Sequence, residues 1–245
     1  MNNKTKDKLS IVVTGGSGRF GSKLKDVKTK YKIYYPNKKE LDILNLKSIK
    51  NYLKKKKPKF LIHMAGLSRP MSIHETDISK SINLNIIGTS NMVIACSKRG
   101  IKLVYISTNF VYPGKKGNYK EEDDLNPFNN YAWSKLGGEA AVKLYKNSLI
   151  LRVCTTEEPF IHRNAFVDVK TNFEYHSKIV PIIFKLLNKK GTINVGGKPQ
   201  TVFNFAKEKK ITVNKIYAKK IFGKNYPVNQ SMDISKMKKI LKINS

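Results

Sequence analysis

Short hydrophobic runs recur along the first 153 residues, and each is followed by a stretch in which apolar residues return every three or four positions. The hydrophobic runs predict strands near 9–14, 31–35, 60–64, 102–107 and 149–153. The stretches between them predict helices near 20–26, 46–56, 76–98 and 131–146. Strands that alternate with helices are typical of a parallel sheet covered on both faces, so we predict an α/β fold with a doubly wound parallel sheet.

The alternation weakens after Arg152, where polar residues such as His162 and Asp168 lie among apolar ones. A chain of 245 residues is long enough for one doubly wound domain with a small accessory lobe. We therefore predict a main domain over residues 1–153. Residues 154–245 are predicted to form a reduced lobe interleaved with the end of the fold.

The N-terminal segment and the cysteines exclude several classes of protein. Residues 1–8 are polar and charged, which predicts no signal peptide, and no apolar run approaches the length of a membrane span. We therefore expect a cytoplasmic protein that does not contact a membrane. Cys96 and Cys154 lack the spacing of metal ligands, as do His162 and His176, so we expect structural thiols and no metal site.

The formal net charge of +31 would by itself suggest nucleic acid as a partner. The kind of basic residue argues against that interpretation. Only five are arginine, at positions 19, 69, 99, 152 and 163, whereas 43 are lysines spread along the whole chain. Specific recognition of bases or phosphates favours the planar fork of arginine, so dispersed lysine indicates a compositional bias. We expect no specific nucleic-acid partner.

The segment TGGSGRFG, at residues 14–21, follows the first predicted strand. In a strand–turn–helix, Gly15 would permit the tight turn and Gly18 would let backbone N–H groups approach a pyrophosphate. Gly21 would let the helix pack on the sheet, and the helix N-terminus would face the negative charge. An ordinary glycine-rich turn is the alternative for this segment taken alone.

Tyr131 and Lys135 lie four residues apart on a predicted helix, so both side chains project from one face. An adjacent ammonium favours the phenolate, and we expect Lys135 to lower the pKa of Tyr131 from its ordinary value of about 10. Thr108 ends a buried strand and can reach the same carbonyl oxygen in this layout. A solvated helix face is the alternative for Tyr131 and Lys135 taken alone.

Together these segments resemble the extended short-chain dehydrogenase/reductase superfamily, and within it the dTDP-4-dehydrorhamnose reductase-like branch that binds sugar nucleotides. The resemblance covers approximately residues 9–243 and rests on seven segments in the same order. They are residues 14–21, 41–43, 63–66, 85–89, 107–114, 131–135 and 149–152. The resemblance implies a Rossmann-like fold in which residues 1–153 bind NAD(P) and a small C-terminal lobe binds the substrate.

The resemblance also implies roles for individual residues. Cofactor contacts are implied for Gly15, Gly18, Arg19, Phe20, Gly21, Asp42, Ile43, Ala65, Gly66, Asn85, Tyr131 and Lys135. Substrate contacts are implied for Ser107, Thr108 and Arg163, of which Arg163 could hold a diphosphate. A capping or solvated asparagine is the alternative for Asn85, and an ordinary surface arginine is the alternative for Arg163.

Cofactor choice depends on the end of the second predicted strand. An acid there would hold the ribose hydroxyls of NAD and repel the additional phosphate of NADP. The stretch YYPNKK, at residues 34–39, contains no acid and ends in two lysines. We therefore predict NADP, as NADPH, in preference to NAD. NAD stays the alternative because lysine is common throughout the chain.

The resulting prediction is an NAD(P)H-dependent oxidoreductase that reduces the C4 carbonyl of a nucleotide-linked 4-keto-6-deoxy sugar, with Thr108, Tyr131 and Lys135 as its catalytic residues. Such a reaction belongs to nucleotide-sugar, dTDP-rhamnose or surface-polysaccharide biosynthesis. The related 4,6-dehydratases typically carry Asp-Glu after the threonine, and the Asn109-Phe110 found here argues against dehydration. A sugar-nucleotide epimerase and a non-catalytic NAD(P)-binding sensor or scaffold are the alternatives. We also expect a homodimer.

Overall fold

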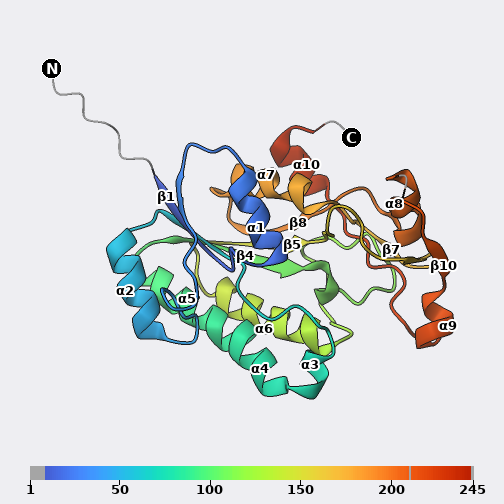
Figure 1. Cartoon of the computed structure of the whole chain (residues 1–245), viewed down its shortest axis with the longest axis horizontal. Coiled ribbons are helices and arrows are strands. Elements are labelled where there is room, and N and C mark those ends of the chain that lie inside the picture. The colour runs from blue at the N-terminus through green and yellow to red at the C-terminus, as the bar shows by residue number, and fades with distance from the viewer. Residues whose placement is uncertain (1–8, 210, 244–245) are drawn as a thin grey trace.

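A six-stranded sheet forms the centre of the computed structural model, which describes residues 9–209 and 211–243. The strand order is β2-β1-β3-β4-β5-β8, and every neighbouring pair is parallel (Figure 1). The strands are β1 (Ser10–Thr14), β2 (Lys32–Tyr34), β3 (Phe60–His63), β4 (Lys102–Thr108), β5 (Ser148–Val153) and β8 (Gly191–Val195). The predicted doubly wound sheet is confirmed, and each of the five predicted strands matches an observed one to within one residue at each end.

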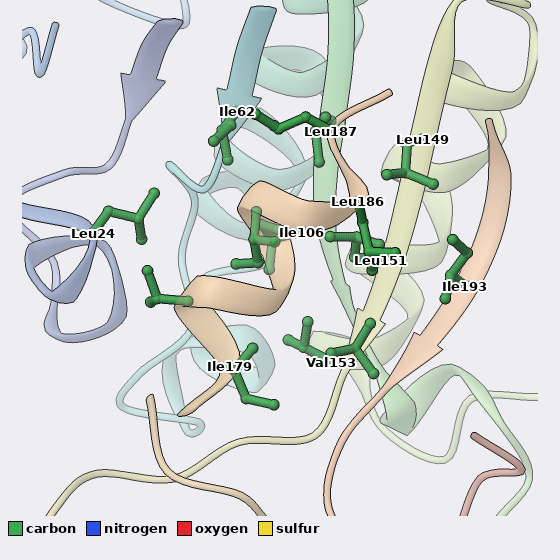
Figure 2. Close-up of a cluster of buried hydrophobic side chains, with 14 of the residues drawn as sticks. Leu24, Ile62, Ile106, Leu149, Leu151, Val153, Ile179, Leu186, Leu187 and Ile193 are labelled. Atoms are coloured by element: carbon green, nitrogen blue, oxygen red, sulfur yellow. The ribbon is translucent and has the colours of Figure 1, made fainter. Parts of the chain in front are cut away.

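Helices cover both faces of this sheet (Figure 1). One face carries α2 (Leu46–Lys56), α5 (Gly88–Ser97) and α6 (Asn130–Lys143), and the other carries α1 (Arg19–Ser22), the 3₁₀ turn η1 (Lys23–Asp26), α7 (His176–Leu186) and α10 (Ser235–Leu241). Figure 2 shows Ile179 and Leu186 of α7 packed against Leu151 and Val153 of β5. Because both faces are buried, the strands are continuous hydrophobic runs rather than alternating ones.

The predicted helix over 76–98 is four shorter pieces. They are α3 (Ile73–Thr76), α4 (Ile78–Ile82), a π-helical turn η2 (Asn83–Ile87) and α5. Asp77 separates the first two pieces because its carboxylate accepts the backbone N–H of Lys80 and caps α4. The apolar spacing alone could not reveal this cap or the wide turn.

The chain after β5 completes the sheet and also builds a small lobe. β8, α7 and α10 belong to the layers of the main sheet. The lobe contains β6 (Asn164–Phe166), β7 (Lys170–Thr171), β9 (Gln200–Thr201), α8 (Val202–Glu208), β10 (Asn214–Ile216) and α9 (Ala218–Phe222). β6 pairs in parallel with β10, and β7 pairs antiparallel with β9. Its core is aromatic, with the rings of Phe160, Phe173 and Tyr175 packed around Phe205.

The sequence predicts neither a signal peptide nor a membrane span. Residues 1–8, for which the sequence predicts no signal peptide, lie outside the described residues. Within the part of the chain that is described, no helix combines the length and the apolar character needed to span a bilayer.

Candidate active site

A cavity of about 660 Å³ opens at the carboxyl ends of β1, β3 and β4. Open α/β sheets bind ligands at this edge, where the strand order reverses on either side of β1. Most of the predicted site residues line the cavity, namely Gly15, Gly18, Arg19, Phe20, Gly21, Asp42, Ile43, Ala65, Gly66, Ser107, Thr108, Tyr131 and Lys135. Asn85 and Arg163 do not line it.

The glycine-rich turn forms one wall of the cavity and has no room for side chains. Gly15 has φ +75°, and a Cβ there would stand 2.6 Å from the backbone nitrogen of Ala65. A Cβ on Gly21 would collide with the carbonyl oxygen of Gly15. The N–H of Gly18 donates to that same oxygen at 3.0 Å and closes the turn. This backbone cradle fits a dinucleotide whose phosphates approach the main chain.

The helix predicted after this turn is short. α1 has four residues and continues as the 3₁₀ turn η1. A helix of one turn has little dipole to offer a phosphate, so any phosphate binding here depends on the backbone N–H groups of the turn.

β4 and α6 bring Thr108 and Tyr131 to the same cavity. α6 begins after Asn129, whose side chain accepts the backbone N–H of Ala132 at 2.8 Å. Burial raises the pKa of Tyr131, while a hydrogen bond with Thr108 and the positive charge of Arg69 lower it in part. The phenol therefore stays protonated at neutral pH and can act as a proton donor.

The structure corrects the expectation that Lys135 lowers the pKa of Tyr131. The Nζ of Lys135 lies over the ring of Tyr105, 4.2 Å from its centroid. Burial lowers the pKa of Lys135 to about 7, and the charge of Glu139 raises it in part. The pKa of Tyr131 is raised because burial outweighs its neighbours, and the cation that acts on the phenol is Arg69. Helical spacing correctly places Tyr131 and Lys135 at one cavity, but the partner of the ammonium comes from β4.

Asn85 lies behind the cavity and is buried. Its Nδ2 donates to the carbonyl of Leu67 at 2.9 Å and to Oγ of Ser134 at 2.8 Å, and its Oδ1 accepts the N–H of Leu67 at 2.7 Å. The side chain therefore ties the loop after β3 to α6. It is neither a helix cap nor solvated.

His63 belongs to a second buried network that the sequence did not predict. Oγ1 of Thr89 donates to the carbonyl of Asn85 at 2.8 Å, so it accepts from Nε2 of His63 at 3.2 Å. Nδ1 of His63 then accepts from Oγ1 of Thr14 at 2.7 Å. Burial lowers the pKa of His63 to about 3, with the charge of Lys135 acting in the same direction. The imidazole is therefore neutral with its proton on Nε2.

We expect the protein to lose stability as the pH falls from about 6.5 toward 3. In the unfolded chain His63 binds a proton below its ordinary pKa of about 6.5, whereas the folded chain keeps it neutral, so acid favours unfolding. At pH 5 this linkage removes about 2 kcal/mol of unfolding free energy. Urea unfolding at pH 7.5 and pH 5.0 measures it. His63→Gln does not titrate and should lose less stability by that amount, and an equal loss in both proteins would contradict this assignment.

Two predicted substrate residues have different positions. Ser107 is buried and lines the cavity, and its Oγ has no hydrogen-bond partner among the described residues. This hydroxyl can serve a ligand. Arg163 is exposed, directly before β6, and lies outside the cavity.

Asn109, which follows the predicted catalytic Thr108, is buried at the base of the lobe. Its Nδ2 donates to Oγ1 of Thr171 at 3.3 Å and to the carbonyl of Gln230 at 3.5 Å. A carboxylate could not donate to that carbonyl, so the amide suits this site better than the acid.

Sequence reasoning missed a charged cluster in the cavity, formed by Arg19, Arg69 and Glu157. Oε1 of Glu157 lies 3.0 Å from Nη1 of Arg69 and 3.5 Å from Nη1 of Arg19. His176 completes this wall, with its ring stacked on Phe20 at 4.8 Å between centroids. Arginine at positions 19 and 69 of a lysine-rich chain was the signal that could have revealed the cluster.

Comparison with known proteins identifies relatives that are similar in sequence over part of this chain. A dTDP-4-dehydrorhamnose reductase of Aggregatibacter actinomycetemcomitans is 28% identical over 151 residues, which cover 60% of this chain and 51% of that protein. Methionine adenosyltransferase 2 subunit beta of Xenopus tropicalis is 33% identical over 115 residues, which cover 46% of this chain and 34% of that protein. The matched regions thus span about a third to a half of these two relatives.

Among solved structures, the dTDP-4-dehydrorhamnose reductase of Bacillus anthracis in complex with NADP has a TM-score of 0.81 at 24% identity. The likeness covers 92% of this chain and 90% of that one, and it shows the shared fold. The family model described as the RmlD substrate binding domain matches residues 9–169. The resemblance seen in the sequence is therefore confirmed, and the chain belongs to the RmlD substrate binding domain family.

Proposed function

We propose that this chain is an NAD(P)H-dependent reductase of a nucleotide-linked 4-keto-6-deoxy sugar, as its relatives named dTDP-4-dehydrorhamnose reductase suggest. The observation that carries the proposal is the presence of Thr108, Tyr131 and Lys135 in the same cavity as the glycine cradle. A cavity of about 660 Å³ also has the volume of a site for small molecules.

The chain's own residues would handle the proton and the carbonyl oxygen. Oγ1 of Thr108 accepts the N–H of Phe110 at 3.3 Å, which leaves its hydroxyl hydrogen to donate toward Tyr131 or the substrate oxygen. Tyr131 would deliver the proton to that oxygen as a general acid. Lys135 would hold the ribose of the cofactor, and the cofactor would supply hydride to the carbonyl carbon.

The protonation state of Tyr131 favours reduction over epimerisation. An epimerase of this kind begins by oxidising an alcohol, for which the tyrosine must first act as a base. Burial raises the pKa of Tyr131, so at neutral pH the proton is present and ready to be donated. The protonated phenol is the form that reduction requires at the start, and the epimerase stays the alternative.

NADPH oxidation with a panel of 4-keto-6-deoxy sugar nucleotides tests the proposal. We expect stoichiometric oxidation with at least one member. The second candidate is a non-catalytic NAD(P)-binding sensor or scaffold, and a relative named as a subunit, methionine adenosyltransferase 2 subunit beta, is compatible with it. NADPH binding by calorimetry without oxidation across the panel would favour that candidate, and interconversion of 4-hydroxy epimers would favour the epimerase.

We further propose that the cofactor is NADPH, as in the solved complex with NADP. Lys38 lines the cavity beside Asp42 and Ile43, whereas Lys39 does not. An ammonium there suits the 2′-phosphate, so Lys38→Met should weaken NADPH binding about tenfold, the scale of one charged hydrogen bond, and leave NADH binding nearly unchanged. Calorimetric titration with both cofactors measures this effect. Lys39→Met is the matched control, and equal losses in the two variants would contradict the role of Lys38.

We also propose that the protein is cytoplasmic and that it forms a homodimer. Ile82, Ile87, Ile94 and Trp133 are large apolar side chains exposed on α4, η2, α5 and α6. A second copy could cover them, and a two-fold dimer would use the same patch on both chains. Sedimentation equilibrium should find a dimer in the wild type and a monomer in Ile94→Lys, whereas a wild-type monomer would contradict the proposal.

A further inference from the structure

Arginine is so rare in this chain, with five residues against 43 lysines, that its positions are informative. Lysine serves as well at most exposed sites, but only arginine offers a planar fork of five donors. Arg152 illustrates a fork used within the protein. Its Nε, Nη1 and Nη2 all donate, to the carboxylate of Glu139, the hydroxyl of Tyr112 and the carbonyl of Glu121.

Arg69 is used differently. Within the described part of the chain its guanidinium makes one hydrogen bond, from Nη1 to Oε1 of Glu157 at 3.0 Å. Its side chain is 40% exposed, and it lines the cavity. The remaining donors of the fork are thus accessible to a ligand in the cavity.

The contact with Glu157 holds this guanidinium in a defined place. Glu157 is 14% exposed and contacts both Arg69, on the loop after β3, and Arg19, the first residue of α1. Two guanidiniums therefore meet one carboxylate, which leaves this part of the cavity with a net positive charge. Arg19 begins α1, directly after Gly18 of the glycine cradle, whereas Arg69 comes from the loop after β3.

Arg69 also lies close to the reacting end of the cavity. Its charge is one of the influences that lower the pKa of Tyr131, and it acts on His176 in the same direction. Because Arg69 and Tyr131 line the same cavity, a sugar nucleotide whose carbonyl faces Tyr131 would lie within the field of this guanidinium, and its diphosphate is the part that carries negative charge. Arg163, which the sequence suggested for a diphosphate, is outside the cavity.

We propose that Arg69 binds the diphosphate of the sugar-nucleotide substrate, that Glu157 orients its guanidinium for this task, and that Arg19 serves the cofactor. The inference rests on the proposed function only for the sugar, because the chemistry recognised is that of a nucleoside diphosphate. Phosphate oxygens accept two parallel hydrogen bonds from an arginine fork, which an ammonium cannot supply.

Calorimetric titration of the full chain tests the proposal, with dTDP, UDP and GDP as probes in the presence of saturating NADPH so that the cofactor site is filled. Arg69→Met should weaken the best-bound nucleoside diphosphate at least about tenfold and change NADPH binding less than threefold. Arg19→Met should show the reverse pattern. Arg69→Lys should recover only part of the affinity, and Arg99→Met, which removes a distant arginine, should bind both ligands as the wild type does.

Several outcomes would overturn the inference. These are a wild type that binds none of the three diphosphates, equal losses for diphosphate and NADPH in Arg69→Met, or a larger loss of diphosphate in Arg163→Met than in Arg69→Met. Thermal unfolding of each variant checks its fold, and Arg69→Gln replaces Arg69→Met if that variant is destabilised. Failure of the reductase proposal would look different, because dTDP would still bind through Arg69 while no keto sugar caused NADPH oxidation.

Discussion

Replacing Tyr131 with phenylalanine is expected to reduce turnover about a hundredfold or more while leaving cofactor affinity nearly unchanged. Phenylalanine keeps the ring that packs against His74 and Phe110, at 5.1 and 6.3 Å between centroids. It removes the phenol that, alone among the described tyrosines, lines the cavity beside Thr108. The hydroxyl of Thr108 is a poor proton donor near neutrality and cannot replace it.

Single-turnover NADPH oxidation with saturating keto-sugar nucleotide measures this effect, alongside a cofactor titration. Unchanged single-turnover rates in Tyr131→Phe would remove the tyrosine from the mechanism. Loss of cofactor binding would show that the substitution disturbed the site instead of testing its chemistry. Thr108→Val is the companion variant, and we expect a smaller loss because only a hydrogen bond to the oxygen disappears.

Replacing Arg152 with methionine is expected to lower the free energy of unfolding by about 3–5 kcal/mol. Arg152 and Glu139 are 1% and 0% exposed, and their closest atoms are 2.9 Å apart. Without the guanidinium, the Glu139 carboxylate would remain in the core without its ion-pair partner, and the hydroxyl of Tyr112 would lose a donor. The loss of unfolding free energy therefore arises mainly because the buried Glu139 carboxylate is left unpaired, and less because the attraction between the two charges is lost.

Urea unfolding at pH 7.5 separates these two contributions. The double variant Arg152→Met/Glu139→Met removes both charges and should regain much of the stability lost in the single variant. Arg163→Met, at an exposed position, should change stability by no more than about 0.5 kcal/mol. A double variant as unstable as Arg152→Met would mean that packing, rather than charge, dominates at this site.

The parts of the fold that the sequence predicted correctly depend on local patterns. The five strands are continuous apolar runs, because each is buried on both faces of the sheet. The glycine-rich turn can be recognised in the sequence because Gly15 and Gly21 have no space for a side chain and must be glycine. Tyr131 and Thr108 are at an element start and an element end, where parallel topology brings them to one edge.

The parts that it missed depend on contacts between distant segments. The lobe strands have two or three residues each, too few for a periodic pattern, and are defined by partners such as β6 with β10. α7 carries Pro181 within it, which weakens any helix prediction there. Lys135 packs on the ring of Tyr105, which is 30 positions away in the sequence. Arg69 pairs with Glu157, which is 88 positions away.

The π-helical turn η2 has a consequence for how this segment can vary. Such a turn holds one more residue than an α-helical turn, and each residue of an α-helix advances about 100° around the axis. Deleting Leu84 would merge α4 and α5 into one regular helix and rotate one part against the other by roughly that angle. Asn85 could then no longer face both Leu67 and Ser134, so the loop after β3 would separate from α6. Removing a residue from this segment would thus rotate one helix relative to the other. We therefore expect the site to depend on the number of residues in the segment more than on the identity of its exposed side chains.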